Sequence, residues 1–225
     1  MKILNYLTLG LIIPIYVAIV YFAVNFKGPI YLNTNIDVKE KFGAVQNLPN
    51  AVYDAIIRLK TEENKYFCTG FSVDGNYAIT AAHCVEWLGT SEKIRVYDKN
   101  DTFTGVEAVV VGYNQRNDTA VIKGDFRNFK AVVIEKDRHG FASSTGPFLT
   151  CGYPYANKAL YCSYATPVRM KNFSMLLKGA LIPGMSGGPV FDLNTNKVVG
   201  LNSAVEEDLI VVNPLVGIMG SFGLE

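Results

Sequence analysis

The segment GMSGGPV, residues 184–190, places one serine among three glycines. Glycine adopts backbone conformations that other residues avoid, so the chain can turn sharply here and present the hydroxyl of Ser186. The same composition is also common in tight turns that have no chemical role. A serine hydroxyl becomes a strong nucleophile only when a base takes its proton, so a catalytic serine requires a suitable base elsewhere in the chain.

The candidate base is His83, one of two histidines, which lies in the segment TAAHC, residues 80–84. A further segment, NDTAVIK at 117–123, places Asp118 ahead of a β-prone run. A carboxylate can fix the tautomer and orientation of an imidazole, and the imidazole can then activate a serine. Each residue alone also fits an ordinary role, His83 as a core or surface histidine and Asp118 as a turn residue.

Composition argues against several other kinds of site. The formal net charge is only +1 and the basic residues form no run or stripe, so nucleic acid is not expected as a partner. The other histidine, His139, lies in the charged segment KDRHG, residues 136–140, where we expect an exposed loop and not a second base. Closely spaced ligand pairs typical of zinc sites are not found, so no metal is expected.

Short β-prone runs separated by turn residues make up most of the chain after residue 50. They do not alternate with helices, which disfavours a parallel α/β sheet. Strands of this length and spacing predict an all-β barrel or sandwich. The predicted strand runs are 51–59, 65–73, 76–82, 93–98, 105–113, 119–124, 130–135, 148–154, 160–168, 188–193, 197–205 and 216–222.

Near the amino terminus, the segment YLTLGLIIPIYVAIVYFAVNF, residues 6–26, carries no charge. A helix that rises ~1.5 Å per residue over this segment reaches ~31 Å, which matches a hydrocarbon core of ~30 Å. We therefore expect a transmembrane helix after a short tail at 1–5 and before a linker at 27–50. A cleaved signal peptide and a buried core helix are the alternatives, although the apolar core of a signal peptide is usually only ~7–15 residues.

The four cysteines fall in two closely spaced pairs, Cys68 with Cys84 and Cys151 with Cys162. An even number in such pairs is typical of disulfides that form outside the cytoplasm. Because Cys151 and Cys162 flank a predicted hairpin, we expect a disulfide across it, with free buried thiols as the alternative. The domain that follows the anchor is therefore expected on the non-cytoplasmic side of the membrane, in a periplasm or outside the cell.

Taken together, TAAHC, NDTAVIK and GMSGGPV resemble the histidine, aspartate and serine blocks of the trypsin/chymotrypsin-like serine peptidases. The resemblance covers roughly residues 51–222 and is closest to the compact bacterial branch that includes the Deg, or high-temperature-requirement, proteases, here without the PDZ domain of that branch. It implies a chymotrypsin-like fold of two antiparallel six-stranded β-barrels within 51–225. The first barrel would span about residues 51–135 and the second about 140–225, with the active site between them.

Carried over residue by residue, the resemblance implies a catalytic triad. His83 would be the general base, Asp118 would orient it, and Ser186 would attack the carbonyl of a protein or peptide substrate to form an acyl-enzyme. The backbone N–H groups of Gly184 and Ser186 would form the oxyanion hole. The family also bonds the cysteine that follows the histidine to one on the preceding strand, which implies a Cys68–Cys84 disulfide. This chemistry needs no cofactor.

The resemblance also implies where the substrate side chain binds. Ala180, six residues before the serine, would lie at the floor of the pocket for the residue that precedes the scissile bond, and Leu181, Ser203 and Gly217 would line it. No acidic residue occupies these positions, so we expect a preference for small to medium apolar side chains. Next to the serine, Met185 stands where many digestive-type relatives carry an aspartate.

Two other functions are alternatives to a serine endopeptidase. The same fold could serve as a catalytically silent module that binds peptides or anchors a partner, but the three triad residues are all present and such a module has no physical need of them. An esterase with a G-x-S-x-G elbow requires a histidine after the serine, and none follows Ser186. The sequence therefore predicts a membrane-anchored serine endopeptidase.

Overall fold

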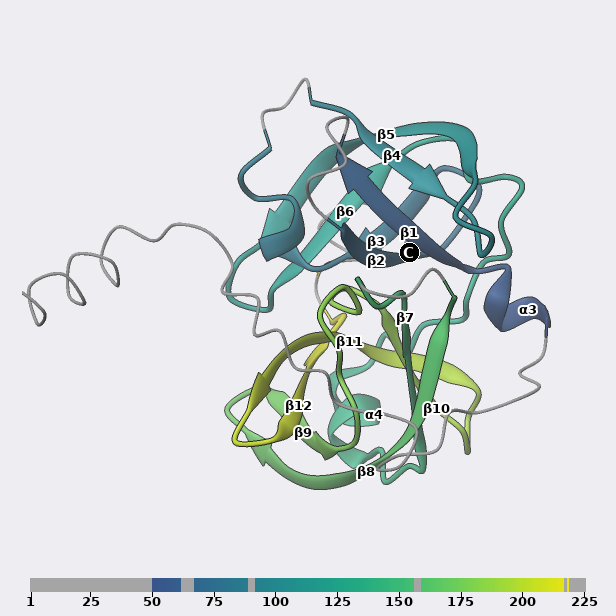
Figure 1. Ribbon diagram of the computed structural model, residues 1–225. Helices are drawn as coiled ribbons and strands as arrows, with labels where there is room; N and C mark the ends of the chain where they lie inside the picture. Colours follow the sequence, from purple (N-terminus) through teal and green to yellow (C-terminus); the bar gives the residue numbers. More distant parts are fainter. Residues whose placement is uncertain (1–49, 62–66, 89–91, 156–158, 217, 219–225) are drawn as a thin grey trace, which may run out of the picture. The chain divides into compact units, whose positions relative to one another are not determined.

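A computed structural model describes residues 50–61, 67–88, 92–155, 159–216 and 218 (Figure 1). Within these residues, six strands form a first closed antiparallel barrel in the spatial order β1-β2-β3-β6-β5-β4. The strands are β1 (Ile56–Thr61), β2 (Phe67–Ser72), β3 (Tyr77–Thr80), β4 (Ile94–Tyr97), β5 (Phe103–Asn114) and β6 (Thr119–Lys123). A short helix, α3 (Asn50–Tyr53), precedes β1, and the 3-10 turn η1 (Ala82–Cys84) follows β3.

A second closed antiparallel barrel has the order β10-β11-β12-β9-β8-β7. Its strands are β7 (Phe148–Gly152), β8 (Tyr161–Lys171), β9 (Ser174–Lys178), β10 (Pro189–Asp192), β11 (Lys197–Glu206) and β12 (Leu209–Pro214), and α4 (Arg138–Ser143) precedes them. Strands β11 and β12 are joined by Glu207 and Asp208, whose φ angles of 50° and 65° suit a two-residue hairpin turn. The predicted all-β fold of two six-stranded barrels is confirmed.

The apolar core explains why the strands close in this way. Residues of β4 alternate between buried and half-buried, and four of the five residues of β6 are fully buried, so both faces of this strand, which lies between β3 and β5, are covered. One cluster of buried side chains runs through the first barrel and continues into residues of the second, among them Leu149, Tyr153 and Leu201. A separate cluster, which includes Phe148, Leu177 and Ile210, fills the second barrel.

Several local predictions were wrong. The run 130–135 is not a barrel strand: Val132 N–H bonds to the carbonyl of Ser72, while Val133 and Glu135 bond to Val198. The segment thus connects the two barrels. Its β-branched residues predict a strand, but Val133 is 64% exposed, Ile134 alone among its apolar residues is buried, and the backbone makes an isolated bridge to Val198 instead of a strand. Likewise, the run 51–59 begins with α3, and His139 lies in α4 and not in a loop, because Asp137 accepts a hydrogen bond from His139 N–H and caps the helix.

Strands β9 and β12 were not among the predicted runs, and the run 216–222 lies mostly outside the described residues. The predicted anchor at 6–26 also lies outside them, as does the predicted linker at 27–50 except for Asn50, which begins α3. In the portion of the chain that the structure describes, no helix is long and apolar enough to cross a membrane.

Candidate active site

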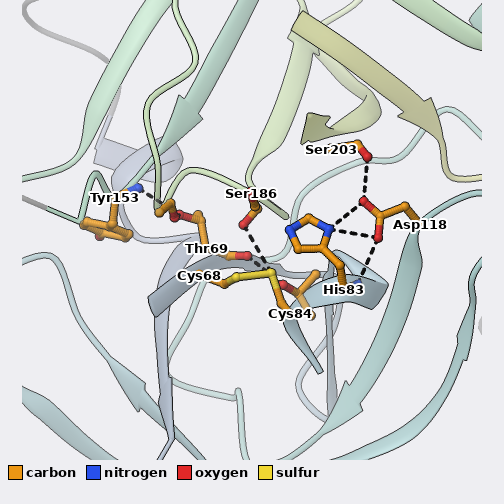
Figure 2. The surroundings of a disulfide bond; sticks show 10 residues. Cys68, Thr69, His83, Cys84, Asp118, Tyr153, Ser186 and Ser203 are labelled. Atoms are coloured by element: carbon orange, nitrogen blue, oxygen red, sulfur yellow. Dashed lines mark hydrogen bonds and ion pairs between the residues drawn. A yellow bond between two sulfur atoms is a disulfide. The ribbon is translucent and has the colours of Figure 1, made fainter. Parts of the chain in front are cut away.

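Strand pairing in the first barrel brings His83 and Asp118 together. Strand β3 runs antiparallel to β6 with Thr80 opposite Ala120, so η1 at the end of β3 meets the turn that precedes β6. The Nδ1 atom of His83 lies 2.8 Å from Asp118 Oδ2 and 3.0 Å from Asp118 Oδ1 (Figure 2). The backbone N–H of His83 also donates to Asp118 Oδ1 at 2.9 Å. The carboxylate therefore fixes both the ring and the backbone of the histidine.

Asp118 reaches this position through an unusual backbone conformation. Its φ angle of 47° lies in the left-handed region, which costs a residue other than glycine about 1–2 kcal/mol. Hydrogen bonds from neighbouring groups compensate for this cost: the Asp118 N–H donates to Gln115 O at 3.3 Å, and the Ser203 hydroxyl donates to Asp118 Oδ2 at 2.5 Å. Ser203 belongs to β11, so the second barrel supplies one of the carboxylate's partners.

The two groups shift each other's protonation. Burial would lower the pKa of His83, but the hydrogen bond and charge of Asp118, with a smaller contribution from Glu86, raise the pKa above its ordinary value. Burial would raise the pKa of Asp118, but hydrogen bonds from the ring of His83, from Ser203 and from the His83 backbone, together with the charge of the imidazole, lower it. Asp118 thus stays ionised and holds a proton on Nδ1, which leaves the opposite ring nitrogen to act as a base.

Ser186 lies on the side of the imidazole ring that faces away from Asp118 (Figure 2). Its carbonyl accepts a hydrogen bond from Thr69 N–H at 2.9 Å, which ties it to β2 of the first barrel. The following residue must be glycine: Gly187 has a φ of +81°, and a Cβ there would lie 2.3 Å from the carbonyl oxygen of Thr69. The glycines of the quoted segment therefore allow the serine to sit against β2.

The residues before Ser186 form a tight turn. Met185 N–H donates to Ile182 O at 3.0 Å, with Pro183 and Gly184 between them and a φ of +98° at Gly184. Proline followed by a left-handed glycine is the pattern of a type II turn. Within the described residues, the N–H groups of Gly184 and Ser186 donate to no protein acceptor, although both belong to this turn region.

Two carbonyl groups fix the direction of these N–H groups. In a trans peptide the C=O and the N–H of one unit point in opposite directions. The Pro183 carbonyl accepts from Tyr155 N–H at 2.7 Å, and the Met185 carbonyl accepts from Gly188 N–H at 3.0 Å. Because these carbonyls are held, the N–H groups of Gly184 and Ser186 on the same peptide units are held as well, facing away from those donors.

The two predicted disulfides are confirmed. Cys68 and Cys84 are joined with a Cα–Cα distance of 6.2 Å, and the Cys84 sulfur lies 4.0 Å from the carbonyl oxygen of Ser186 (Figure 2). Cys151 and Cys162 are opposite each other on β7 and β8 and are also joined. The first bridge joins η1, which carries His83, to β2, and Thr69 of β2 donates its N–H to the carbonyl of Ser186.

A metal site is not suggested by the cysteines near the histidine. The ligand atoms of Cys68, His83 and Cys84 lie within 4.8 Å of one another. Two of these three atoms are the sulfurs of the disulfide, so the group offers no thiolate, which is the form of cysteine that binds metal.

The structure describes three of the four residues predicted to line the substrate pocket. Ala180 and Leu181 are half-buried, the carbonyl of Ala180 accepts from the Ser163 hydroxyl at 3.4 Å, and Leu181 packs against the core cluster of the second barrel. The Ser203 side chain contacts Asp118. Gly217 lies outside the described residues. The composition of the pocket therefore stays a prediction.

The contacts of three residues at this site were not predicted from the sequence, although Ser203 was expected in the substrate pocket. Thr69 contacts the turn before Ser186 although the two are far apart in the chain, the Ser203 hydroxyl binds Asp118, and Gln115 Nε2 donates to Glu86 Oε2 at 3.0 Å. None of the three lies in a recognisable local pattern. Their roles depend on contacts between strands, which only the closed barrels reveal.

Comparisons with known proteins agree with the fold and show the family. The family model described as a trypsin-like peptidase domain matches residues 68–201. The crystal structure of the active form of the Rv3671c protease from M. tuberculosis is similar with a TM-score of 0.62 at 20% identity, over 76% of this chain and 80% of that chain. The structure of Deg5 is similar with a TM-score of 0.60 at 18% identity, over 73% of this chain and 85% of that chain.

A serine endoprotease from Yersinia pestis has a TM-score of 0.62 at 18% identity, over 80% of this chain and 66% of that chain. At these identities the likeness shows a shared fold. No curated protein sequence matches the chain.

Proposed function

The chain belongs to the trypsin-like peptidase family, and from this membership we propose that it is a serine endopeptidase in which His83, Asp118 and Ser186 form the catalytic triad. The observation that carries the proposal is the contact between the Asp118 carboxylate and His83 Nδ1 at 2.8 Å, with Ser186 on the other side of the ring (Figure 2). This is the arrangement that a base needs in order to activate a serine hydroxyl.

The reaction would proceed in two steps through an acyl-enzyme. In the first, the free ring nitrogen of His83 takes the proton from Ser186 Oγ while that oxygen bonds to the substrate carbonyl carbon. The N–H groups of Gly184 and Ser186 would stabilise the negative charge on the carbonyl oxygen, and Asp118 the positive charge on the imidazole. His83 then gives its proton to the leaving amine as the C–N bond breaks. In the second step water, activated by His83, releases the acyl group and restores Ser186.

We further propose that the substrate is a protein or peptide and that the domain works outside the cytoplasm, held by a single transmembrane helix at residues 6–26. The support for the location is the presence of two disulfides, Cys68–Cys84 and Cys151–Cys162, which form and persist in oxidising compartments. The support for the anchor is the uncharged length of the segment.

The rival function is a catalytically silent peptide-binding or anchoring module of the same fold. Such a module would not need a histidine with a raised pKa beside a serine, nor two backbone N–H groups that find no acceptor among the residues the structure describes. The two functions differ in the reactivity of Ser186, which can be measured directly.

A serine-reactive phosphonate probe tests the proposal. We expect the full chain to be labelled on Ser186, as located by mass spectrometry of the digested protein, because only an activated serine displaces the leaving group on phosphorus. Labelling should disappear in Ser186→Ala and in His83→Ala, and should persist in His139→Ala, which removes the other histidine. A folded wild-type chain that takes up no probe would favour the silent module.

A further inference from the structure

We propose that Thr69 is the positioning residue that sets the oxyanion turn from the first barrel. This inference rests on the proposed function, because it assigns a role in the same active site. Thr69 lies on β2 next to Cys68 and is fully buried. Its side chain and backbone contact the turn that carries Ser186, as Figure 2 shows for Thr69, Tyr153 and Ser186.

Thr69 contacts the turn on both sides of Met185. Its hydroxyl donates to the carbonyl oxygen of Gly184 at 2.8 Å, and its backbone N–H donates to the carbonyl oxygen of Ser186 at 2.9 Å. Gly184 and Ser186 are also the residues whose N–H groups have no protein acceptor within the described residues. One residue of the first barrel therefore holds both residues that would supply the oxyanion donors.

Two further hydrogen bonds fix the side chain and the backbone of Thr69. The hydroxyl oxygen of Thr69 accepts a hydrogen bond from Tyr153 N–H at 2.8 Å, and the backbone carbonyl of Thr69 accepts one from the Thr80 hydroxyl at 2.8 Å. Because the hydroxyl accepts from Tyr153, its own proton is directed to Gly184. All the polar groups of this buried residue are thus paired, as buried polar groups must be if they are to stabilise a structure.

Burial and contacts with the first barrel fix the position of Tyr153. It is 1% exposed, its hydroxyl donates to Ile56 O at 3.3 Å, and the guanidinium carbon of Arg58 lies 4.9 Å from the centre of its ring. The tyrosine follows β7 in sequence but is held by β1 of the first barrel. The Tyr153 N–H that orients Thr69 therefore belongs to a residue fixed by both barrels.

Loss of the Thr69 hydroxyl should lower kcat. An oxyanion hole works only if its donors already point at the position of the developing charge, and losing one donor costs roughly 10²–10³-fold in kcat. Without the Thr69 hydroxyl, the Gly184 carbonyl loses its donor. Within the described residues, the Gly184–Met185 peptide, which links the two peptide units that carry the donors, is then held only by the bond from Met185 N–H to Ile182 O. Because the donors remain in the chain but are less well oriented, we expect a smaller loss, of about 10- to 100-fold in kcat, with KM changed little.

The test compares Thr69→Val with Thr69→Ser in the full chain. The valine variant keeps the shape but removes the hydroxyl, and should lose kcat as stated, whereas the serine variant keeps the hydroxyl and should retain kcat within about threefold. Thr150→Val is the matched control, because Thr150 is also fully buried and its hydroxyl contacts Ser163 of the second barrel. It should lower stability to a similar extent and leave kcat near the wild-type value.

Amide hydrogen exchange gives a readout that does not require activity. The Tyr153 N–H should exchange faster in Thr69→Val and remain protected in Thr69→Ser, because only the serine keeps the acceptor. If Thr69→Val fails to fold, Thr69→Ala removes the same hydroxyl with less crowding and replaces it in both measurements. Wild-type kcat in the folded valine or alanine variant would overturn the inference, as would unchanged exchange at Tyr153. A wild-type chain that neither hydrolyses peptides nor reacts with the phosphonate would instead overturn the proposed function.

Discussion

Ser203 donates its hydroxyl to Asp118, with 2.5 Å between Ser203 Oγ and Asp118 Oδ2, so a residue of the second barrel holds a carboxylate that belongs to the first. The side chain of Asp118 is 18% exposed, and a hydrogen bond to such a charged group is worth about 1.5–3 kcal/mol. Its removal should free the carboxylate to turn away from the imidazole.

We therefore expect Ser203→Ala to lower kcat by about tenfold, because the carboxylate then holds the imidazole less firmly, and to lower the free energy of unfolding at neutral pH by about 1.5–3 kcal/mol, because Asp118 loses this hydrogen bond. The measurement is peptide hydrolysis by the full chain. Ser203→Thr retains the hydroxyl and should recover most of the activity. Equal rates in the alanine and wild-type proteins would show that the contact does not orient Asp118 during turnover.

The rise of kcat/KM on the acid side of its pH profile should follow the deprotonation of His83. Asp118 and Glu86 are the charged groups that raise the pKa of His83, and the disulfide beside it does not titrate. Because the raised pKa keeps the imidazole protonated to higher pH, the neutral base appears only above about 6.5, the ordinary value, and kcat/KM should rise with pH through that region.

Glu86→Gln removes one of these charges and should move the midpoint of the rise in kcat/KM to lower pH. Gln115 can still donate to the new amide, so the bridge between the two turns is kept. Asp208→Asn at the β11–β12 turn makes the same change in net charge and serves as the control, since it should leave the midpoint in place. With only two histidines, an NMR titration can assign the shift to His83, using His139→Gln to identify the other ring. A midpoint that does not move in Glu86→Gln would rule out its contribution.

Activation should not require cleavage. In digestive-type relatives a new terminal ammonium pairs with an aspartate next to the serine, but here Met185 stands in that position and is fully buried. An ammonium buried beside a thioether would cost several kcal/mol. Met185 instead packs closely on Gly152, where a Cβ would lie 2.7 Å from the Met185 Cα and Cβ.

We expect the uncleaved full chain to react with the phosphonate. Met185→Leu, which conserves volume, should remain active, whereas Met185→Asp should lose both activity and several kcal/mol of unfolding free energy through an unpaired buried carboxylate. Probe labelling confined to a shortened chain, with a new terminus between residues 27 and 51, would show that cleavage is needed.

The side chain before the scissile bond should be small or medium-sized and apolar, such as Val, Ala or Leu. Ala180 brings no charge to the predicted floor of the pocket, and a methylene difference in an apolar pocket discriminates by only about 10–200-fold. A peptide-library profile measures the preference, and Ala180→Asp should add cleavage after Arg or Lys. Dominant cleavage after Arg or Lys by the wild type would contradict the predicted pocket.

The sequence was most informative where chemistry depends on neighbours in the chain. The β-prone runs predicted an all-β barrel or sandwich. Glycines around Ser186 and the position of His83 directly before Cys84 carried the resemblance that implied the two barrels and the first disulfide. The run 130–135 misled because its β-branched residues favour a strand, whereas the segment joins the two barrels and buries only Ile134 among its apolar side chains. Thr69 and Ser203 could not be assigned their contacts, since each depends on which strand end meets which turn.

The central claim is that His83 and Ser186 act as one unit, and kinetics of the single and double alanine variants test it most directly. If Ser186 needs the base, His83→Ala, Ser186→Ala and the double variant should all lose a similar and nearly complete share of peptide hydrolysis, on the order of 10⁶ in kcat. The comparison uses purified full chain whose folding is checked by its circular dichroism. Losses that simply add in the double variant, or a wild-type rate in Ser186→Ala, would contradict the assignment.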